Sequence, residues 1–187
     1  LELRSELKKK GHIFSSTSDT EVIIHQYEED GEDCLRKFNG MFSFVIWDRR
    51  NRKLFGARDR AGIKPLYYYV SDKKLILASE IKAIIEDPSI QREPDYHAIA
   101  DYFYAGRALA GKTAFKHIKE VEPGHLVSFN SNDKNFRIKK YWDLVFDYNS
   151  SRRIDETREE LFHLLDDAVK VHCRSDAPLG CHLSGGI

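Results

Sequence analysis

The sequence predicts an α+β fold with antiparallel sheets, followed by the first helix and strand of a separate α/β region. Segments with a helical spacing of apolar residues lie on both sides of a central block of short apolar runs. Within that block the runs come in pairs joined by short polar turns, which is typical of β-hairpins. A polar stretch without periodicity over residues 147–155 then precedes one more amphipathic helix, so we expect a second region to begin there.

The first elements are helical, and the chain opens in a helical-looking segment. Ser18 and Glu21 have the spacing of a capping box, in which each side chain reaches the other residue's backbone N–H. The helix that follows is expected to end at Gly31 and to bury one face that carries Val22, Ile23 and Tyr27. A further short helical turn is predicted by Cys34, Leu35 and Phe38.

Two hairpins follow. The first pairs Met41–Trp47 with Lys53–Ala57, and the second pairs Pro65–Val70 with Leu75–Ala78. Apolar residues occupy nearly every position of the strands in Phe42–Trp47 and Leu75–Ala78. This pattern predicts strands that are covered on both faces, and therefore an internal sheet.

Helices and strands alternate in the remainder of this region. A short helix is expected from Ser79 to Pro88, and another after Pro94 whose buried face carries Tyr96, Ile99, Ala100 and Phe103. Short strands are expected at Leu126–Phe129 and Phe136–Ile138. Beyond the polar stretch, Asp155 is expected to cap a helix that carries Leu161, Leu164, Leu165 and Ala168 on one face, and Pro178–Leu183 is expected to form a buried strand.

Composition excludes several classes of protein. The 187 residues are 41% hydrophobic and 32% charged, which is typical of a globular protein rather than a disordered one. Lys+Arg and Asp+Glu are both 30, so no basic excess favours nucleic acid or an acidic membrane. No apolar stretch is long enough for a membrane span and no signal peptide is visible, so we expect a cytoplasmic protein.

The cysteines and histidines give no sign of a dedicated site. Three sparse cysteines, Cys34, Cys173 and Cys181, indicate reduced thiols rather than a disulfide framework. Cys34 is expected in the core and Cys181 in the buried strand, and none has the neighbours that activate a nucleophile. The eight histidines form no metal-binding motif, so no metal ligand is assigned.

Two segments are candidates for binding. The run from Leu183 to Ile187 contains Ser184, Gly185 and Gly186 after a predicted strand, as in loops that cradle phosphate, although a simple tight turn is the alternative. Asp19 is a carboxylate at the start of a helix, where it is also explained by the helix dipole alone.

Two further segments are open to a structural and a functional interpretation. The turn with Arg58, Asp59 and Arg60 is either a functional loop or an ion pair that shapes the turn at Gly62. The tyrosines of 67–69 are explained more simply by a half-buried strand than by a platform for stacking bases.

Five blocks, in this order, give the chain a family resemblance. They are Phe38–Asp48, Ala57–Tyr68, Ala78–Ala83, Glu120–His125 and Pro178–Gly186. Together they resemble the glutamine-hydrolysing asparagine synthetases over nearly the whole chain. The resemblance implies an N-terminal-nucleophile glutaminase domain, an αββα sandwich, over residues 1–146, a linker over 147–154, and the start of an ATP-binding synthetase domain over 155–187.

The resemblance also implies an activity and its partners. The family hydrolyses glutamine with an N-terminal cysteine and transfers the ammonia to an aspartyl-adenylate made from aspartate, ATP and Mg²⁺. Carried over to this sequence, Asp19 would bind the α-ammonium group of glutamine. His182, Leu183, Ser184, Gly185 and Gly186 would contact ATP, although the family usually has an apolar residue where His182 stands. A homodimer is left open, and neither nucleic acid nor a membrane is expected as a partner.

Departures from the family pattern point to a piece of a longer protein. Residue 1 is Leu1, and the nucleophilic cysteine, the glutamine-binding Arg and the oxyanion-hole Asn-Gly of the family are not in the chain. The Asp-Ser expected after Ile187 is also absent. We therefore expect this polypeptide alone to lack glutaminase and ligase activity. The alternatives for the parent protein are a related amidotransferase with another acceptor, such as a sugar or a β-lactam precursor, and a non-catalytic glutaminase-like binding protein.

Overall fold

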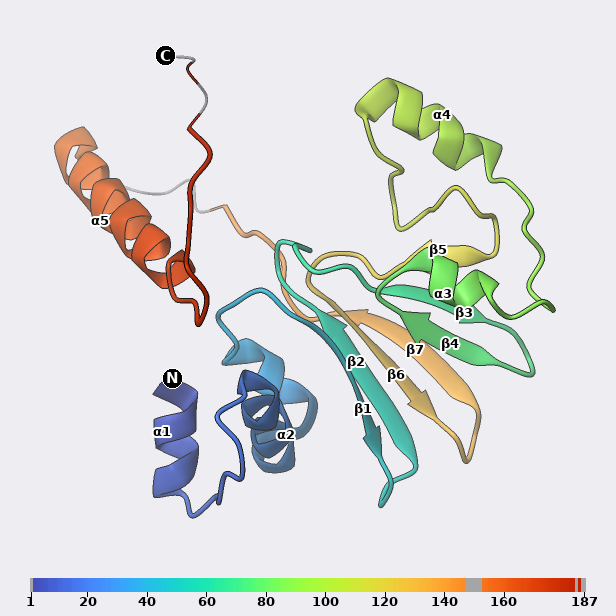
Figure 1. The fold of residues 1–187 in the computed structure, drawn as a ribbon, viewed down its shortest axis with the longest axis horizontal. Helices are drawn as coiled ribbons and strands as arrows, with labels where there is room; N and C mark the ends of the chain where they lie inside the picture. The colour runs from blue at the N-terminus through green and yellow to red at the C-terminus, as the bar shows by residue number, and fades with distance from the viewer. Residues whose placement is uncertain (1, 147–152, 184, 186–187) are drawn as a thin grey trace. The chain divides into compact units, whose positions relative to one another are not determined.

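The computed structural model describes residues 2–146, 153–183 and 185. The chain divides into two compact units, Leu1–Leu144 and Val145–Ile187, and each is described by itself. The first unit contains two antiparallel sheets with helices beside them (Figure 1). Among the described residues, no helix combines the length and the apolar character that a membrane crossing requires.

The two sheets are built from hairpins. The first sheet has the order β1-β2-β6-β7, with β1 Ser43–Asp48, β2 Lys53–Arg58, β6 His125–Asn130 and β7 Asn135–Lys140. The second has the order β4-β3-β5, with β4 Leu75–Ala78, β3 Tyr67–Val70 and β5 Ile118–Glu120. All neighbouring strands are antiparallel. Both predicted hairpins and the pair of later strands are confirmed, whereas β5, only three residues long, was not predicted.

The side chains of the strands alternate between two layers of core, as the pleat requires. On β2, Phe55 and Ala57 face a cluster with Cys34 and Leu35, which belong to the helical segment before the sheet. Val127 of β6 instead lies in a cluster with Tyr68 and Leu77 of the second sheet and with Leu66, which directly precedes β3. The first sheet is therefore covered by helices on one face and by the second sheet on the other.

Helices form the two outer layers. α1 Glu2–Lys9, α2 Asp19–Asp30 and the 3₁₀-helix η1 Gly31–Arg36 lie against the first sheet, and Leu35 and Cys34 are fully buried there. α3 Ile81–Ile85 packs on the second sheet, where Ile84 meets Ile118 of β5. Tyr67 and Tyr69 face this same cluster, so the half-buried strand predicted for the tyrosines is confirmed. The order helix–sheet–sheet–helix is the predicted αββα sandwich.

Two predicted burial patterns are wrong in the first unit. β1 is an edge strand, so Val45 and Trp47 are 42% and 49% exposed, while Phe44 and Ile46 face the core. Helix α4 Tyr96–Ala105 forms as expected, but Tyr96 and Phe103 of its predicted buried face are 76% and 85% exposed. The side of α4 that is buried carries Ala98, since the apolar residues of this short helix are spread around its axis.

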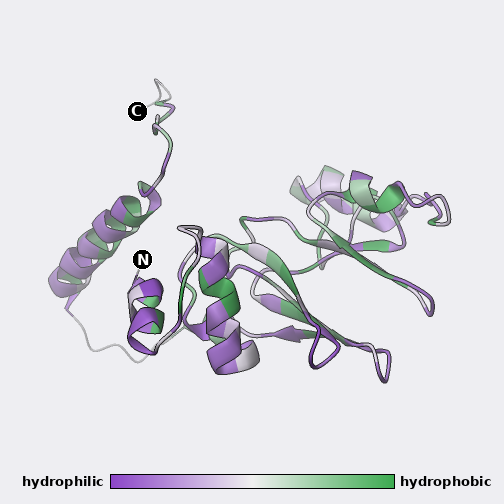
Figure 2. Cartoon of the chain, turned by 60° about the horizontal axis from the view of Figure 1, so that its bottom comes forward, coloured by the Kyte–Doolittle hydropathy of each residue, from purple (hydrophilic) through white to green (hydrophobic). Residues whose placement is uncertain are grey.

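The second unit contains α5 Ile154–His172, which is amphipathic as predicted (Figure 2). The helix begins one residue before Asp155, so Arg153 and not Asp155 is the N-cap. The predicted strand over Pro178–Leu183 is not formed, and Cys181 is exposed rather than buried. A strand requires a neighbour that satisfies its backbone groups, and the described residues of this unit contain no other strand. The predicted linker falls mostly on residues 147–152, which lie outside the described residues.

Candidate functional site

Asp19 is the first residue of α2 and is exposed to solvent. The preceding residue, Ser18, is the N-cap, and its Oγ accepts a hydrogen bond from the Thr20 backbone N–H at 3.2 Å. No described residue forms a hydrogen bond or an ion pair with the Asp19 carboxylate. The helix therefore begins without using this carboxylate, which leaves its oxygens available to a ligand.

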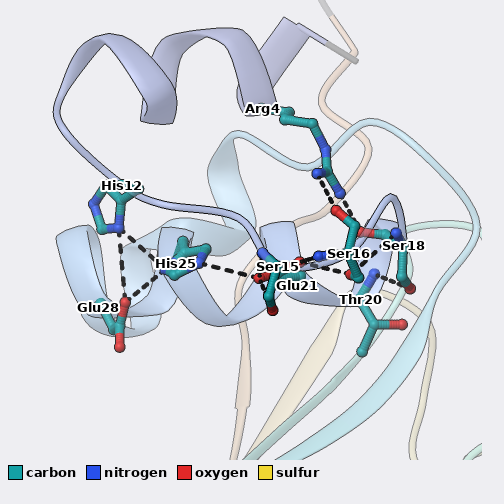
Figure 3. A network of polar contacts seen from close by, with 9 residues as sticks. All are labelled: Arg4, His12, Ser15, Ser16, Ser18, Thr20, Glu21, His25 and Glu28. Carbon is teal, nitrogen blue, oxygen red and sulfur yellow. Dashed lines mark hydrogen bonds and ion pairs between the residues drawn. The ribbon is translucent and has the colours of Figure 1, made fainter.

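The segment that leads to Asp19 is fixed by Glu21, a residue of the same helical turn. Its Oε1 accepts hydrogen bonds from Ser15 N and Oγ at 2.7 and 2.9 Å, and its Oε2 accepts from Ser16 N and Oγ at 2.8 and 2.6 Å (Figure 3). Hydrogen bonds to Ser16, followed by those to Ser15, lower the pKa of Glu21 to about 2. The capping-box prediction was half right, because Glu21 bonds these serines instead of the Ser18 backbone N–H.

Arg4 of α1 holds the same segment from its other side. Its Nη1 donates to the Ser16 carbonyl oxygen at 2.7 Å, and its Nη2 donates to the Ser18 carbonyl oxygen. The guanidinium group also lies over the Phe14 ring, 4.3 Å from the ring centroid. Backbone N–H groups and carbonyl groups of the segment are thus both bound by charged side chains. Sequence reasoning missed Arg4, because nothing in the sequence shows that α1 packs beside this segment.

The turn with Arg58 and Asp59 uses its charges in another way. Asp59 is 1% exposed, and its carboxylate accepts backbone N–H bonds across the turn, at 3.1 Å from Ala61, 3.0 Å from Ile63 and 3.0 Å from Lys64. A fourth N–H, that of Phe42, lies at 3.3 Å. Backbone N–H groups bind both oxygens of this carboxylate, so the Asp59 side chain is not available to a ligand.

Arg58 completes this turn from the opposite side. Its guanidinium donates to the carbonyl oxygens of Lys64, Val121 and Gly62 at 2.9, 2.6 and 2.7 Å, and lies 2.8 Å from Glu120 Oε1. Arg58 and Asp59 therefore each bind the turn, and the structural interpretation of this motif is the correct one. These bonds to the backbone shape the turn at Gly62, rather than an ion pair between Arg58 and Asp59.

The cysteines do not provide a nucleophile in the described residues. Cys34 is fully buried, and burial raises the pKa of its thiol to about 12, so the thiolate is not available at neutral pH. Cys173 and Cys181 are exposed and belong to the second unit. The core position predicted for Cys34 is confirmed.

The predicted nucleotide loop is described only in part. His182, Leu183 and Gly185 are exposed and lie in neither helix nor strand, whereas Ser184 and Gly186 lie outside the described residues. A Cβ built on Gly185 would meet no atom within 4 Å. The described residues of this segment do not surround a group the size of a phosphate, so no chemical step through ATP or Mg²⁺ is derived from them.

Comparison with protein families identifies the first unit. A model described as a glutamine amidotransferase domain matches residues 1–142, which is most of the chain. The chain belongs to the glutamine amidotransferase family. A second model, asparagine synthase, matches residues 160–187. The second match begins inside α5 and therefore falls in the second unit.

Curated relatives of this chain include proteins with two kinds of name. The chain is 38% identical over 187 residues to asparagine synthetase (glutamine-hydrolyzing) 3 of Bacillus subtilis, covering 100% of this chain and 30% of that protein. It is 34% identical over 177 residues to amidase chyE of Penicillium rubens, covering 93% of this chain and 26% of that protein. The chain therefore spans less than a third of the length of these relatives.

A solved structure supports the fold. The glutamine phosphoribosylpyrophosphate amidotransferase from B. subtilis, complexed with ADP and GMP, aligns with a TM-score of 0.50 at 21% identity. The alignment covers 77% of this chain and 27% of that one. This likeness, together with the four layers described above, identifies the first unit as an N-terminal-nucleophile sandwich of the kind found in glutamine amidotransferases.

Proposed function

We propose that this chain is part of a glutamine-dependent amide ligase that makes asparagine. The succession of two family matches in one chain, glutamine amidotransferase followed by asparagine synthase, carries the proposal. Such an order joins a unit that releases ammonia from glutamine to a unit that uses it. ATP and Mg²⁺ would activate aspartate in the second unit, and His182, Leu183, Ser184, Gly185 and Gly186 are the proposed ATP contacts. We place the complete protein in the cytoplasm.

Asp19 is the proposed contact to substrate glutamine in the first unit. An α-ammonium group needs an ionised or strongly polar acceptor, and the Asp19 carboxylate is exposed and unused by the described residues. A charge-assisted hydrogen bond of this kind contributes about 1.5–3 kcal/mol. Glu21 and Arg4 act on Asp19 indirectly, since they fix the backbone that leads into it. They are positioning residues.

The experiment uses the complete protein with its native ends. Pyrophosphate release is followed with ATP, Mg²⁺ and glutamine, with and without aspartate, and the product is identified by mass spectrometry. Pyrophosphate release that depends on aspartate and yields asparagine would support the proposal. If the protein hydrolyses glutamine but its pyrophosphate release does not depend on aspartate, asparagine is not the product.

A second candidate differs only in the acceptor. The similarity to amidase chyE shows that relatives with another name share this part of the chain at nearly the same identity as the synthetase does. The first unit is therefore no guide to the acceptor. Replacing aspartate by other carboxylic acids in the same assay, with ammonia formation from glutamine as the reference, distinguishes the two candidates. A protein that releases no ammonia from glutamine under any of these conditions would instead be a binding protein.

A further inference from the structure

A cluster of two histidines and a glutamate lies where the connection after α1 meets α2. His12 belongs to that connection, and His25 and Glu28 are three residues apart on one face of α2 (Figure 3). The two histidine side chains are only 15% and 17% exposed, while that of Glu28 is 57% exposed. One potential ligand atom from each residue lies within 4.8 Å of the other two.

The distances within the cluster match those around a tetrahedral metal ion. His12 Nδ1 lies 3.1 Å from His25 Nδ1, His25 Nδ1 lies 2.9 Å from Glu28 Oε2, and His12 Nδ1 lies 3.8 Å from the same oxygen. Bonds of about 2.0–2.2 Å to Zn²⁺ place neighbouring tetrahedral ligands about 3.3–3.6 Å apart. The three observed distances bracket this range, so small side-chain rotations would suffice to enclose an ion.

The remaining nitrogen of each histidine faces a second carboxylate. His12 Nε2 lies 3.0 Å from Glu29 Oε1, and His25 Nε2 lies 3.8 Å from Glu21 Oε1. Histidines that bind metal usually donate their other N–H to a carboxylate, which fixes the tautomer and orients the ring.

Without an ion, the cluster leaves polar atoms poorly satisfied. Two Nδ1 atoms that face each other at 3.1 Å need one proton between them, and the Glu28 oxygen competes for it. His25 Nε2 is buried and has no hydrogen-bond partner among the described residues. A cation that takes both Nδ1 lone pairs would place a proton on each Nε2, where the N–H points toward Glu29 or Glu21.

We propose that His12, His25 and Glu28 form a binding site for a divalent transition-metal ion of which Zn²⁺ is the representative. Three protein ligands leave a fourth position for water. Imidazole nitrogen selects Zn²⁺ over Mg²⁺, which prefers oxygen ligands in octahedral geometry. Because His12 lies outside α2, the bound ion fastens the connection over residues 10–18 to the helix. This site is separate from the proposed glutamine contact, and its test does not depend on enzymatic activity.

The test measures Zn²⁺ binding to the complete protein after removal of metal by a chelator. Zn²⁺ is titrated against a chromophoric competitor, and Co²⁺ is added separately to record the visible absorption of a tetrahedral site. The unmodified protein is expected to bind one ion more than His25→Asn and Glu28→Gln, and only it is expected to show the Co²⁺ band. Because Glu28 is exposed, Glu28→Gln tests a ligand without disturbing the core.

Two further variants grade the effect. Glu29→Gln, which changes an outer partner of His12, is expected to weaken Zn²⁺ binding by about 10–100-fold. His117→Asn is the matched control, because His117 lies 3.2 Å from a glutamate, Glu93, and among the described residues belongs to no group of three potential metal ligands. This control is expected to bind like the unmodified protein.

Hydrogen exchange over residues 10–18 is expected to slow when Zn²⁺ is added, and to remain unchanged with Mg²⁺.

Equal Zn²⁺ stoichiometry and affinity in the unmodified protein, His25→Asn and Glu28→Gln would overturn the proposal. A variant that lacks the His12 imidazole and still binds Zn²⁺ as tightly as the unmodified protein would also overturn it. Unchanged hydrogen exchange over residues 10–18 at full Zn²⁺ occupancy would contradict the assigned fastening of this connection.

Discussion

Two polar segments of the first unit each carry an aspartate, and the backbone uses the two carboxylates differently. In the turn at Gly62, Asp59 is buried and bonds four backbone N–H groups. At the start of α2, Asp19 is exposed, and the hydrogen bonds that fix the backbone come from Glu21 and Arg4 instead. The comparison shows that residue type alone does not tell whether a carboxylate is available to a ligand. What matters is whether the backbone has already used its oxygens.

The largest expected effect comes from removing the buried carboxylate. Asp59→Ala leaves four backbone N–H donors at the turn without their acceptor, so we expect a loss of about 3–5 kcal/mol in the free energy of unfolding. Asp19→Ala is the matched substitution at the exposed position and is expected to cost no more than about 1 kcal/mol, the value of an acid in the first helical turn. Urea denaturation of the complete protein measures both. Similar losses for the two variants would remove the distinction between the segments.

A smaller effect is expected at the glycine of the same turn. Gly62 has a φ of +66°, and a Cβ there would lie 2.7 Å from Pro123 Cγ. Gly62→Ala therefore combines an unfavourable left-handed conformation with a steric clash, and is expected to cost about 2–4 kcal/mol. Gly40→Ala is the control, because a Cβ at Gly40 meets no atom within 4 Å. Thermal unfolding compares the two, and an equal shift in melting temperature would show that the Gly62 turn is not constrained as described.

Below these in size is a pH-dependent contribution from Glu21. Its pKa is lowered from 4.5 to about 2 in the folded protein, by Ser16 first and then Ser15. A lowered folded-state pKa adds stability above the unfolded-state value, and this stability is lost as the pH falls from about 4.5 to about 2. Glu21→Gln is expected to melt at a lower temperature than the unmodified protein above pH 4.5, with the difference disappearing near pH 2.

Glu6→Gln serves as the comparison for this pH profile, since Glu6 is an exposed residue of α1 outside the segment that Glu21 binds. It is expected to give the same profile as the unmodified protein. If Glu21→Gln also follows that profile, Glu21 does not hold the segment before Asp19.

The contrast between the segments also explains what the sequence could predict. The hairpins and α2 were predictable, because each depends on nearby residues: paired apolar runs, or a cap at Ser18 and a stop at Gly31. The exposure of Val45 and Phe103 was not, because it depends on which neighbour covers a strand or helix. Pro178–Leu183 has the composition of a strand, but composition supplies no partner strand.

The candidate site was predictable to a similar extent. Asp19 was proposed from its place at the start of a helix and from the family resemblance; the structure confirms that it begins α2, and its role in binding stays a prediction. The hydrogen bonds that Arg4 donates to this segment could not be predicted, because they join residues 12 or more positions apart in the sequence. The histidine cluster was also missed, since one helical pair, His25 and Glu28, meets a histidine that lies 13 residues before His25. No short motif contains that spacing.

The most direct measurement of the central claim, that the free carboxylate of Asp19 binds substrate, is the KM for glutamine of the complete protein and its Asp19→Asn variant. Loss of one charge-assisted hydrogen bond predicts a rise of about 10–100-fold in KM, with an unchanged melting temperature and unchanged activity when ammonia replaces glutamine. Asp72→Asn, at an exposed aspartate in the turn between β3 and β4, is expected to leave all three quantities unchanged. An unaltered KM for glutamine in Asp19→Asn would contradict the account.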